Sequence, residues 1–406
     1  MLGFDRREQA FERQFAIHEL RAAVRSGDCK AGGKMSHSGS CIDLVHVLTA
    51  RTAGSCKAFP KILWLHAESA NALQKMIHTP HGQISRENLN FCKKSALIED
   101  MSASRSLQKD GITLDSIETS DSRIMVSRTG AELISLAKRD SGGKWHGFLY
   151  RDDETVAPTS GWSNHATVMG YFLHRLWKEQ STYRGAVIRG GNHGFLRHFL
   201  FDPPEVEEQT LIYRVPAARI PPDAYPLKVA LKLSYVLSED RLRVEFLFTN
   251  EEPELEAHVS FGLHPGFAVS SVADCKVIFP EGTYVRYYAP GNFLDGREER
   301  IEFAGGEMPF DKAKLNDSYL IGLEGVARRV FVLEDARLGH RIELDFSEVP
   351  FLTLWSEGPT FICLEPCWGL PDSNPQRPFE QKIGIQTIAC GASLRRSFTI
   401  TPGFLS

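Results

Sequence analysis

The chain has 406 residues, of which 42% are hydrophobic and 24% are charged, an ordinary balance for a globular protein. Its formal net charge is −4, so no overall positive field draws it to nucleic acid or to anionic lipid. No apolar run approaches the roughly 18 residues that span a bilayer, and the first residues lack the apolar stretch of a secretory signal. We therefore expect a cytoplasmic protein with a sizeable core, and neither nucleic acid nor a membrane as its partner.

The composition changes near residue 110. Residues 1–110 carry a net charge of +5 and none of the ten tyrosines, whereas the remaining residues carry a net charge of −9. Few aromatic residues and scattered glycine, serine and lysine indicate weak folding capacity in this first segment, although residues 4–25 and 62–76 show helical spacing of apolar side chains. We predict a poorly structured or partly helical N-terminal extension over 1–110 and one folded domain over 111–406. A basic interaction arm is an alternative role for the extension.

Beyond residue 111, apolar and polar residues alternate, which is the pattern of half-buried β-strands. The alternation runs through residues 227–235 and 242–248, on either side of a polar stretch, and predicts an antiparallel hairpin. It returns in residues 112–117, 123–127, 342–346, 351–355 and 394–400. Many strands joined by proline- and glycine-rich connections, without strand–helix–strand repeats, predict an all-β fold, a large antiparallel β-sandwich.

The eight cysteines show neither the spacing of a disulfide framework nor a zinc-binding CxxC pair. We therefore expect reduced thiols, several of them buried as small apolar groups. They are Cys29, Cys41, Cys56, Cys92, Cys275, Cys363, Cys367 and Cys390.

Three polar residues stand where a plain sandwich has no need of them. His193 lies among glycines, which predicts a tight turn that a ligand can approach closely. His264 and Glu365 each follow an apolar strand and precede a proline, Pro265 or Pro366, so we expect both strands to end there. Because a charge at such a half-buried position is costly unless it is paired or used, we predict that the three side chains share a pocket. Two histidines and a glutamate can also ligate zinc, but no helical HExxH pattern is present and we predict no metal.

Several motifs occur in a fixed order along the chain: Arg175, His193-Gly-Phe-Leu-Arg197, His264-Pro-Gly-Phe267, Glu365-Pro-Cys-Trp-Gly369 and Phe379-Glu-Gln-Lys382-Ile-Gly-Ile385. Together they resemble the aldose 1-epimerase (galactose mutarotase-like) family, in particular its LacX-like branch, over residues 112–402. The chain departs from the family pattern where His174 replaces a glycine and where Cys367 is inserted before Trp368. These departures bear on the identity of the substrate more than on the chemistry.

The resemblance implies a galactose mutarotase-like supersandwich and an isomerase that interconverts the α and β anomers of an aldose. Opening the sugar ring needs a base for the proton of the C1 hydroxyl and an acid for the ring oxygen, and it needs no cofactor. By the same resemblance, Glu365 is the catalytic base and His264 the acid. The residues expected to bind the sugar are His193, Arg175, Asp317, Arg197, Lys382 and Trp368.

Three aromatic residues lie beside these groups in the sequence. Trp368, Phe195 or Phe267 could stack on the apolar face of a sugar ring, but an ordinary place in the sandwich core explains them more simply.

Two other functions stay open. A mutarotase for phosphorylated hexoses would need cationic groups around the phosphate, and Arg175, Arg197 and Lys382 would supply them. A non-catalytic sugar-binding module would share the sandwich but would not need both an acid and a base. The pattern leaves open which aldose is the substrate and whether the protein is a monomer or a homodimer.

Overall fold

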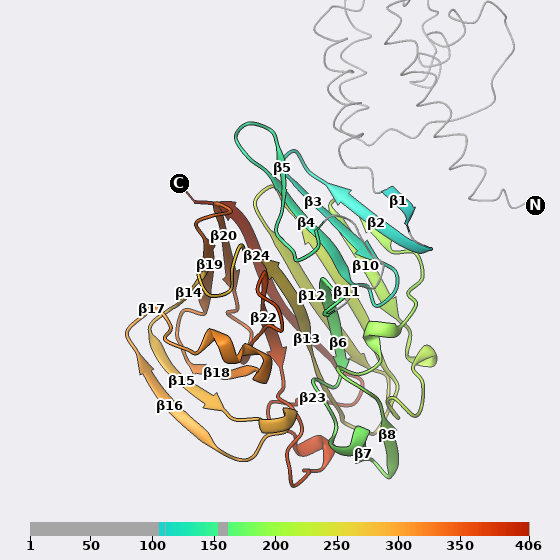
Figure 1. The fold of residues 1–406 in the computed structure, drawn as a ribbon. Coiled ribbons are helices and arrows are strands. Elements are labelled where there is room, and N and C mark those ends of the chain that lie inside the picture. The colour runs from blue at the N-terminus through green and yellow to red at the C-terminus, as the bar shows by residue number, and fades with distance from the viewer. Residues whose placement is uncertain (1–104, 110, 153–160, 406) are drawn as a thin grey trace, which may run out of the picture. The chain divides into compact units, whose positions relative to one another are not determined.

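A computed structural model describes residues 105–109, 111–152 and 161–405, and most of their regular structure is antiparallel β-sheet (Figure 1). All the described residues belong to one compact unit, Met101–Ser406. The prediction of an all-β sandwich is confirmed. The helices expected over 4–25 and 62–76 lie outside the described residues.

One of the two main sheets has nine strands in the order β17-β14-β19-β20-β24-β12-β11-β10-β9. The predicted hairpin is formed by β11 and β12, which pair from Val229 opposite Asn250 to Leu237 opposite Leu242. The nine strands are β9 (Glu205–Glu207), β10 (Thr210–Val215), β11 (Val229–Leu237), β12 (Leu242–Asn250), β14 (Lys276–Phe279), β17 (Gly306–Glu307), β19 (Val330–Asp335), β20 (His340–Asp345) and β24 (Ser393–Phe404).

The second main sheet has eight strands in the order β16-β15-β18-β21-β22-β13-β23, with β6 also paired to β13. One face of it packs on the nine-stranded sheet: the ring of Phe261 in β13 lies 4.6 Å from that of Phe248 in β12. The opposite face is therefore free to carry polar groups. The eight strands are β6 (Ala166–Tyr171), β13 (Ala257–Ala268), β15 (Gly282–Tyr287), β16 (Glu298–Phe303), β18 (Tyr319–Gly325), β21 (Phe351–Trp355), β22 (Phe361–Trp368) and β23 (Gln386–Ile388).

Smaller elements complete the described part. A five-stranded sheet in chain order contains β1 (Arg105–Lys109), β2 (Ile112–Glu118), β3 (Ser122–Ser127), β4 (Leu133–Arg139) and β5 (Trp145–Gly147), and a two-stranded ribbon contains β7 (Gln180–Tyr183) and β8 (Ala186–Arg189). The 3₁₀ helices are η1 (Trp177–Glu179), η2 (Leu196–His198), η3 (Ala217–Arg219), η4 (Pro290–Asn292), η5 (Lys312–Asp317) and η6 (Phe379–Gln381). None of these helices is long and apolar enough to cross a membrane.

Strand β1 lies inside the segment that the sequence assigned to the extension. It pairs with β2, and the hydroxyl of Ser106 donates a hydrogen bond to Asp115 at 2.5 Å. Within the described residues, β1 (Arg105–Lys109) is the first strand, and it lies a few residues before the predicted boundary at residue 111.

A chain that begins at Met101 keeps all the described strands, β1 included. We predict that it unfolds cooperatively, with the same urea midpoint as the full chain, because one buried cluster joins both main sheets. The measurement is urea unfolding of the two chains, followed by far-ultraviolet circular dichroism. A midpoint lowered by about 1 M, which corresponds to about 1–3 kcal/mol, would show that residues 1–100 are a structural part of the domain.

Candidate active site

His264 and Glu365 lie opposite each other on neighbouring antiparallel strands, β13 and β22. The register pairs Gly262 with Cys367 and Gly266 with Cys363, which puts His264 and Glu365 opposite each other between these two pairs. Directly opposite residues in an antiparallel pair share a face of the sheet, and His264 Nε2 lies 3.3 Å from Glu365 Oε1. The side chains are buried, with 8% of His264 and 1% of Glu365 exposed. The structure thus brings these two predicted site residues together.

The sequence suggested that each strand ends at its proline, but both strands continue past it. β13 continues through Pro265 to Ala268, and β22 continues through Pro366 to Trp368. A proline removes only one backbone donor, and the neighbouring strands β6 and β21 still pair with these segments on their other sides. The histidine and the glutamate therefore lie within the sheet, which explains their deep burial.

Two glycines on the same face of β13 make room around His264. A Cβ atom on Gly262 would lie 2.3 Å from the carbonyl oxygen of Pro366, and one on Gly266 would lie 2.3 Å from the ring of Trp162. Real Cβ atoms do not approach other atoms so closely. The glycines therefore allow β22 and Trp162 to lie close to the imidazole.

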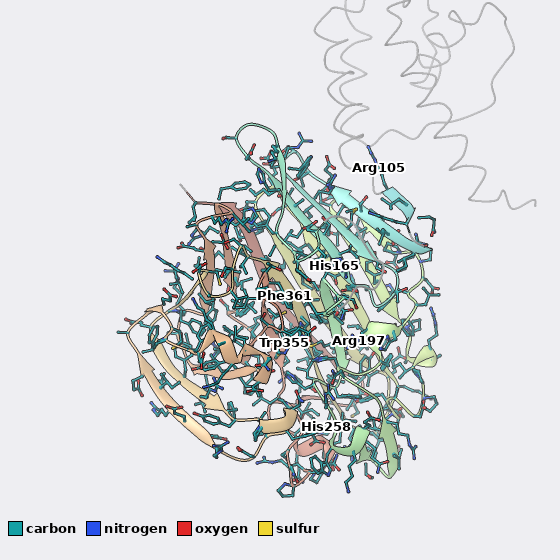
Figure 2. The ribbon with its side chains drawn as sticks, viewed as in Figure 1. Arg105, His165, Arg197, His258, Trp355 and Phe361 are labelled. Carbon is teal, nitrogen blue, oxygen red and sulfur yellow. The ribbon has the colours of Figure 1, made fainter. Side chains whose placement is uncertain are left out.

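Aromatic side chains surround the imidazole of His264. Its ring centroid lies 5.2 Å from that of Trp162, in a stacked arrangement, and 5.4 Å from that of Trp355, edge to face. Phe361 packs against both indoles, at 4.9 Å from Trp162 and 5.8 Å from Trp355. Figure 2 labels Phe361 and Trp355 next to each other. Both tryptophans are only half-buried, so part of each indole remains accessible beside the His264–Glu365 pair.

His193 reaches the pair from the tight turn that the sequence predicted. Its backbone is left-handed, with φ of 62°, and its ring lies 5.4 Å from that of His264 at a right angle. The backbone N–H of His174 donates to His193 Nδ1 at 3.2 Å. Because Nδ1 accepts, the neutral ring carries its proton on Nε2. His193 can therefore donate a hydrogen bond from Nε2.

The next residue, Gly194, also has to be a glycine. It has φ of 70°, and a Cβ atom there would lie 2.2 Å from the carbonyl oxygen of Gly170. The turn therefore packs closely on β6, which fixes the position of His193.

Burial favours the uncharged forms of the titratable groups at the site. It lowers the pKa of His264 to about 3 and the pKa of His174 to about 3, and it lowers the pKa of His193 well below its usual value. Burial also raises the pKa of Glu365 well above the usual value for a carboxyl group. In the free site the proton is therefore held by Glu365, and His264 is neutral.

Lys382 is buried close enough to His174 to act on its pKa, and it forms an ion pair with Asp372. Its Nζ lies 3.5 Å from Asp372 Oδ1, and the two side chains are 1% and 0% exposed. Asp372 also accepts hydrogen bonds from the backbone N–H of Trp177 at 3.0 Å and from Gln376 Nε2 at 2.7 Å. Burial lowers the pKa of Lys382 to about 8, and its charge lowers the pKa of His174. Asp372 therefore compensates the charge of Lys382 only in part, and burial outweighs its effect on the pKa of the lysine.

The two predicted arginines differ in their surroundings. Arg197 is half-buried, and its guanidinium donates at 3.2 Å to Asn164 when that amide is turned so that its oxygen faces donors. Arg175 is exposed on the loop after β6. The charges of both arginines lower the pKa of His193. Both therefore lie within electrostatic range of the site.

Asp317 lies at the exposed end of η5. Within the described residues, no hydrogen bond or ion pair joins it to His264, Glu365 or His193. The connection of η5 to the site is indirect, because Leu315 accepts a hydrogen bond at 3.5 Å from Ser356, the residue after Trp355.

Trp368 lies in the core, and its position does not fit the predicted contact with a sugar. It is three residues from Glu365 in the same strand and therefore faces the other side of the sheet. Its ring stacks on Phe261 at 4.9 Å, its Nε1 donates to the carbonyl of Glu348 at 3.0 Å, and it is 0% exposed. Phe267 and Phe195 also pack in or against this core.

The sequence interpretation missed several residues at the site. Cys363 is two residues before Glu365 on the same face of β22, so the period of the strand would have revealed it. The same two-residue period, applied to the predicted strand 351–355, would have indicated the face on which Trp355 lies. Trp162, His174 and Asp372 lie outside regular alternation, and no local pattern marks them.

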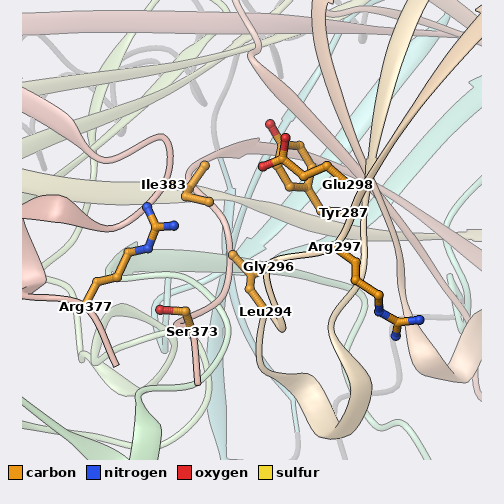
Figure 3. A pocket seen from close by; sticks show the side chains of 8 residues that line it. All are labelled: Tyr287, Leu294, Gly296, Arg297, Glu298, Ser373, Arg377 and Ile383. Atoms are coloured by element: carbon orange, nitrogen blue, oxygen red, sulfur yellow. The ribbon is translucent and has the colours of Figure 1, made fainter. Parts of the chain in front are cut away.

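A separate pocket with an empty volume of about 330 Å³ lies between the loop before β16 and the loop after β22 (Figure 3). None of the predicted site residues lines it. Its residues Leu294, Tyr287 and Ile383 belong to or pack against an apolar cluster that includes Cys367, two residues beyond Glu365.

Comparison with known proteins places the chain in a family. The model of the aldose 1-epimerase family matches residues 116–401. The chain belongs to the aldose 1-epimerase family. It is 28% identical over 235 residues to the plasmid-encoded protein LacX of Lactococcus lactis, which covers 55% of this chain and 78% of that protein, and this places it on the LacX-like branch of the family.

Solved structures show the same fold. A galactose mutarotase related enzyme from Lactobacillus acidophilus has a TM-score of 0.62 at 19% identity and covers 75% of this chain and 98% of its own. A galactose mutarotase-like protein from Lactobacillus casei has a TM-score of 0.60 at 21% identity and covers 74% of this chain and 100% of its own. The galactose mutarotase-like sandwich is thus the fold of this family member.

Replacing Lys382 by methionine removes the cation from a buried pair and leaves the charge of Asp372 uncompensated. We predict that Lys382→Met lowers the free energy of unfolding by about 3–5 kcal/mol. The double variant Lys382→Met/Asp372→Asn should recover much of this loss, because it buries no unpaired charge. Urea unfolding of the three proteins measures both effects, and a single variant as stable as the parent would contradict the structural role of the pair.

Proposed function

We propose that the protein is an aldose 1-epimerase that interconverts the α and β anomers of an aldose through the open-chain aldehyde. The observation that carries the proposal is the 3.3 Å approach of His264 Nε2 to Glu365 Oε1 in a buried site. The ring oxygen and the C1 hydroxyl of the sugar are bonded to the same carbon. The two oxygens are therefore close together, and the two groups that exchange protons with them must also lie close together, as His264 and Glu365 do.

Ring opening needs one proton to leave and one to arrive. One group takes the proton of the C1 hydroxyl, the other gives a proton to the ring oxygen, and the bond between C1 and the ring oxygen breaks as the C1 carbonyl forms. After rotation about the C1–C2 bond, the C5 hydroxyl attacks the other face of the carbonyl and both protons return. The pair therefore shares one transferable proton, in addition to the N–H of the neutral imidazole. The proton lies on the carboxyl group beside a neutral imidazole, or on an imidazolium beside a carboxylate.

Glu365 acts as the base and His264 as the acid in this proposal, which requires the proton to move from Glu365 when the sugar binds. Sugar hydroxyls that donate to the carboxylate favour its charged form, and the proton then passes to His264. His193 donates from Nε2 to an oxygen of the sugar, since the His174 backbone holds Nδ1 as an acceptor. His193 thereby helps to hold the ring against the catalytic pair.

The remaining contacts with the sugar come from the rim of the site. Trp162 and Trp355, which are half-buried beside His264, offer indole faces for the apolar side of the ring. Arg197 and Arg175 donate to hydroxyl groups. Asp317 contacts the sugar from the exposed end of η5.

The charges of the site favour a neutral sugar over a phosphorylated one. Of the three cations considered for a phosphate, Lys382 lies 3.5 Å from the carboxylate of Asp372, so that lysine already has an anionic partner. A module that only binds sugar would have no use for a buried carboxyl group beside an imidazole, because burying them costs free energy.

Glu365→Gln and His264→Asn keep the approximate size of each side chain and remove its proton transfer. We predict that each lowers kcat by at least about 100-fold. The measurement is polarimetry of freshly dissolved α-D-glucose and α-D-galactose, with the uncatalysed rate subtracted. Glu324→Gln, at the exposed end of β18, is the matched control and should retain full activity. Parent-like turnover in a folded Glu365 or His264 variant would remove that residue from the mechanism.

The pH dependence of the reaction tests the buried state of His264. A second proton on the pair stops catalysis, and burial displaces this protonation from the usual histidine range near 6.5 to a pKa of about 3. We therefore predict that kcat/KM stays level as the pH falls from about 7.5 to about 5.5. A decline centred near pH 6.5 would contradict this, because it would place an ordinary, solvated histidine in the mechanism.

A further inference from the structure

Cys363 adds a third potential metal ligand to the catalytic pair. It stands two residues before Glu365 on β22 and faces the same side of the sheet. One ligand atom from each of His264, Cys363 and Glu365 can be chosen so that all three lie within 4.8 Å of one another. All three residues are buried. We call these residues the His264–Cys363–Glu365 triad.

The spacing of two members of the triad, His264 and Glu365, suits a tetrahedral zinc ion. Zinc lies about 2.0–2.1 Å from an imidazole nitrogen and about 2.0–2.2 Å from a carboxylate oxygen. At a tetrahedral angle, two such ligands are about 3.3–3.5 Å apart, and His264 Nε2 and Glu365 Oε1 are 3.3 Å apart. Glu365 Oε2 and His264 Nδ1 have no hydrogen-bond partner among the described residues, so neither residue is committed to another structural contact through these atoms.

The charges of the triad also match a divalent cation. One thiolate, one carboxylate and a neutral imidazole neutralise one divalent cation. Binding of the ion would therefore release protons from the cysteine and the glutamate.

We propose that the His264–Cys363–Glu365 triad binds a thiophilic divalent cation, Zn²⁺ in particular, and that the bound ion inhibits the protein by occupying both proton-transfer groups. Sulfur and nitrogen ligands select Zn²⁺ over Mg²⁺ or Ca²⁺, which prefer oxygen. The inhibition rests on the proposed epimerase function, whereas the binding does not. The ion is an inhibitor and not a cofactor, because ring opening needs the acid and the base free.

The neighbouring cysteine of the same strand provides a matched control. Cys367 stands on the other side of Glu365, faces the same side of the sheet and, like Cys363, is 0% exposed. It lies outside the triad, and its sulfur is 3.6 Å from the hydroxyl of Thr353. Cys363→Ala and Cys367→Ala therefore remove the same atom from equally buried positions, and only the first should affect the cation.

Binding is measured on the full chain after treatment with a chelator, with Cd²⁺ as the probe. Thiolate-to-Cd²⁺ charge-transfer absorption in the ultraviolet reports sulfur ligation, and comparison of the two variants cancels binding by the other six cysteines. We expect Cys363→Ala to lose a share of this absorption that Cys367→Ala keeps. In competition with a chromophoric chelator, Cys363→Ala should bind Zn²⁺ at least about 10–100-fold more weakly than the parent. Loss of a residue that only hydrogen-bonds to a metal ligand already weakens binding by this factor, so loss of a ligand should cost at least as much. Equal absorption and equal Zn²⁺ affinity in the two variants would overturn the proposal.

Glu365→Gln provides a second binding test if Cys363→Ala does not fold. It removes another ligand of the triad, so it should also weaken Zn²⁺ binding by at least about 10-fold relative to the parent. An unchanged affinity would overturn the triad as a metal site.

Inhibition is measured by polarimetry in the presence of Zn²⁺, with Mg²⁺ as a control cation. The parent and Cys367→Ala should lose activity at Zn²⁺ concentrations at least about 10-fold lower than Cys363→Ala requires. A Cys363-dependent absorption in a protein without epimerase activity would refute the proposed function and leave the metal site standing. An active protein whose Cd²⁺ absorption does not depend on Cys363 would refute the metal site alone, and binding without inhibition would refute the inhibitory role.

Discussion

The site depends on the burial of a carboxyl group opposite an imidazole on two neighbouring strands. Removing either charge from water costs several kcal/mol, so His264 and Glu365 stay uncharged until a ligand compensates them. The register of β13 and β22 fixes their separation at 3.3 Å, which a flexible loop would not do. Gly262 and Gly266 let β22 and Trp162 approach the imidazole of His264 closely. The turn at His193 brings the imidazole of His193, a hydrogen-bond donor, next to the ring of His264.

Much of this arrangement could be predicted from the sequence, because it follows from the two-residue period of a strand. Alternation of apolar residues predicted the sandwich and the hairpin of β11 and β12, and apolar segments leading to His264 and Glu365 predicted their convergence. The same period, applied further, would have placed Cys363 on the face of Glu365 and Trp368 on the opposite face. The sugar-binding role expected for Trp368 came from its nearness in sequence, which does not determine the face.

Other features depend on contacts that no local pattern records. Pro265 and Pro366 are local signals for the end of a strand, but pairing with β6 and β21 outweighs them. Trp162 and Asp372 contact residues far away in the sequence. Trp162 stacks on His264, and Asp372 accepts a hydrogen bond from the backbone N–H of Trp177. Strand β1 also has no apolar alternation to mark it, because it is a polar edge strand that is held by pairing with β2 more than by apolar burial.

The charge balance of the site links its chemistry to its selectivity. Asp372 partly compensates the buried cation Lys382, and the histidines are neutral, so the interior presents hydrogen-bond donors and acceptors with little net charge, which suits an uncharged aldose. The same dryness that keeps the proton on Glu365 also keeps Cys363 a thiol. Both groups can become anions together when a divalent cation lies between them. Under the proposed function and the proposed metal site, Cys363 adds sensitivity to soft metal ions to a proton transfer that itself needs no metal, and the identity of residue 363 sets that sensitivity independently of the proton transfer.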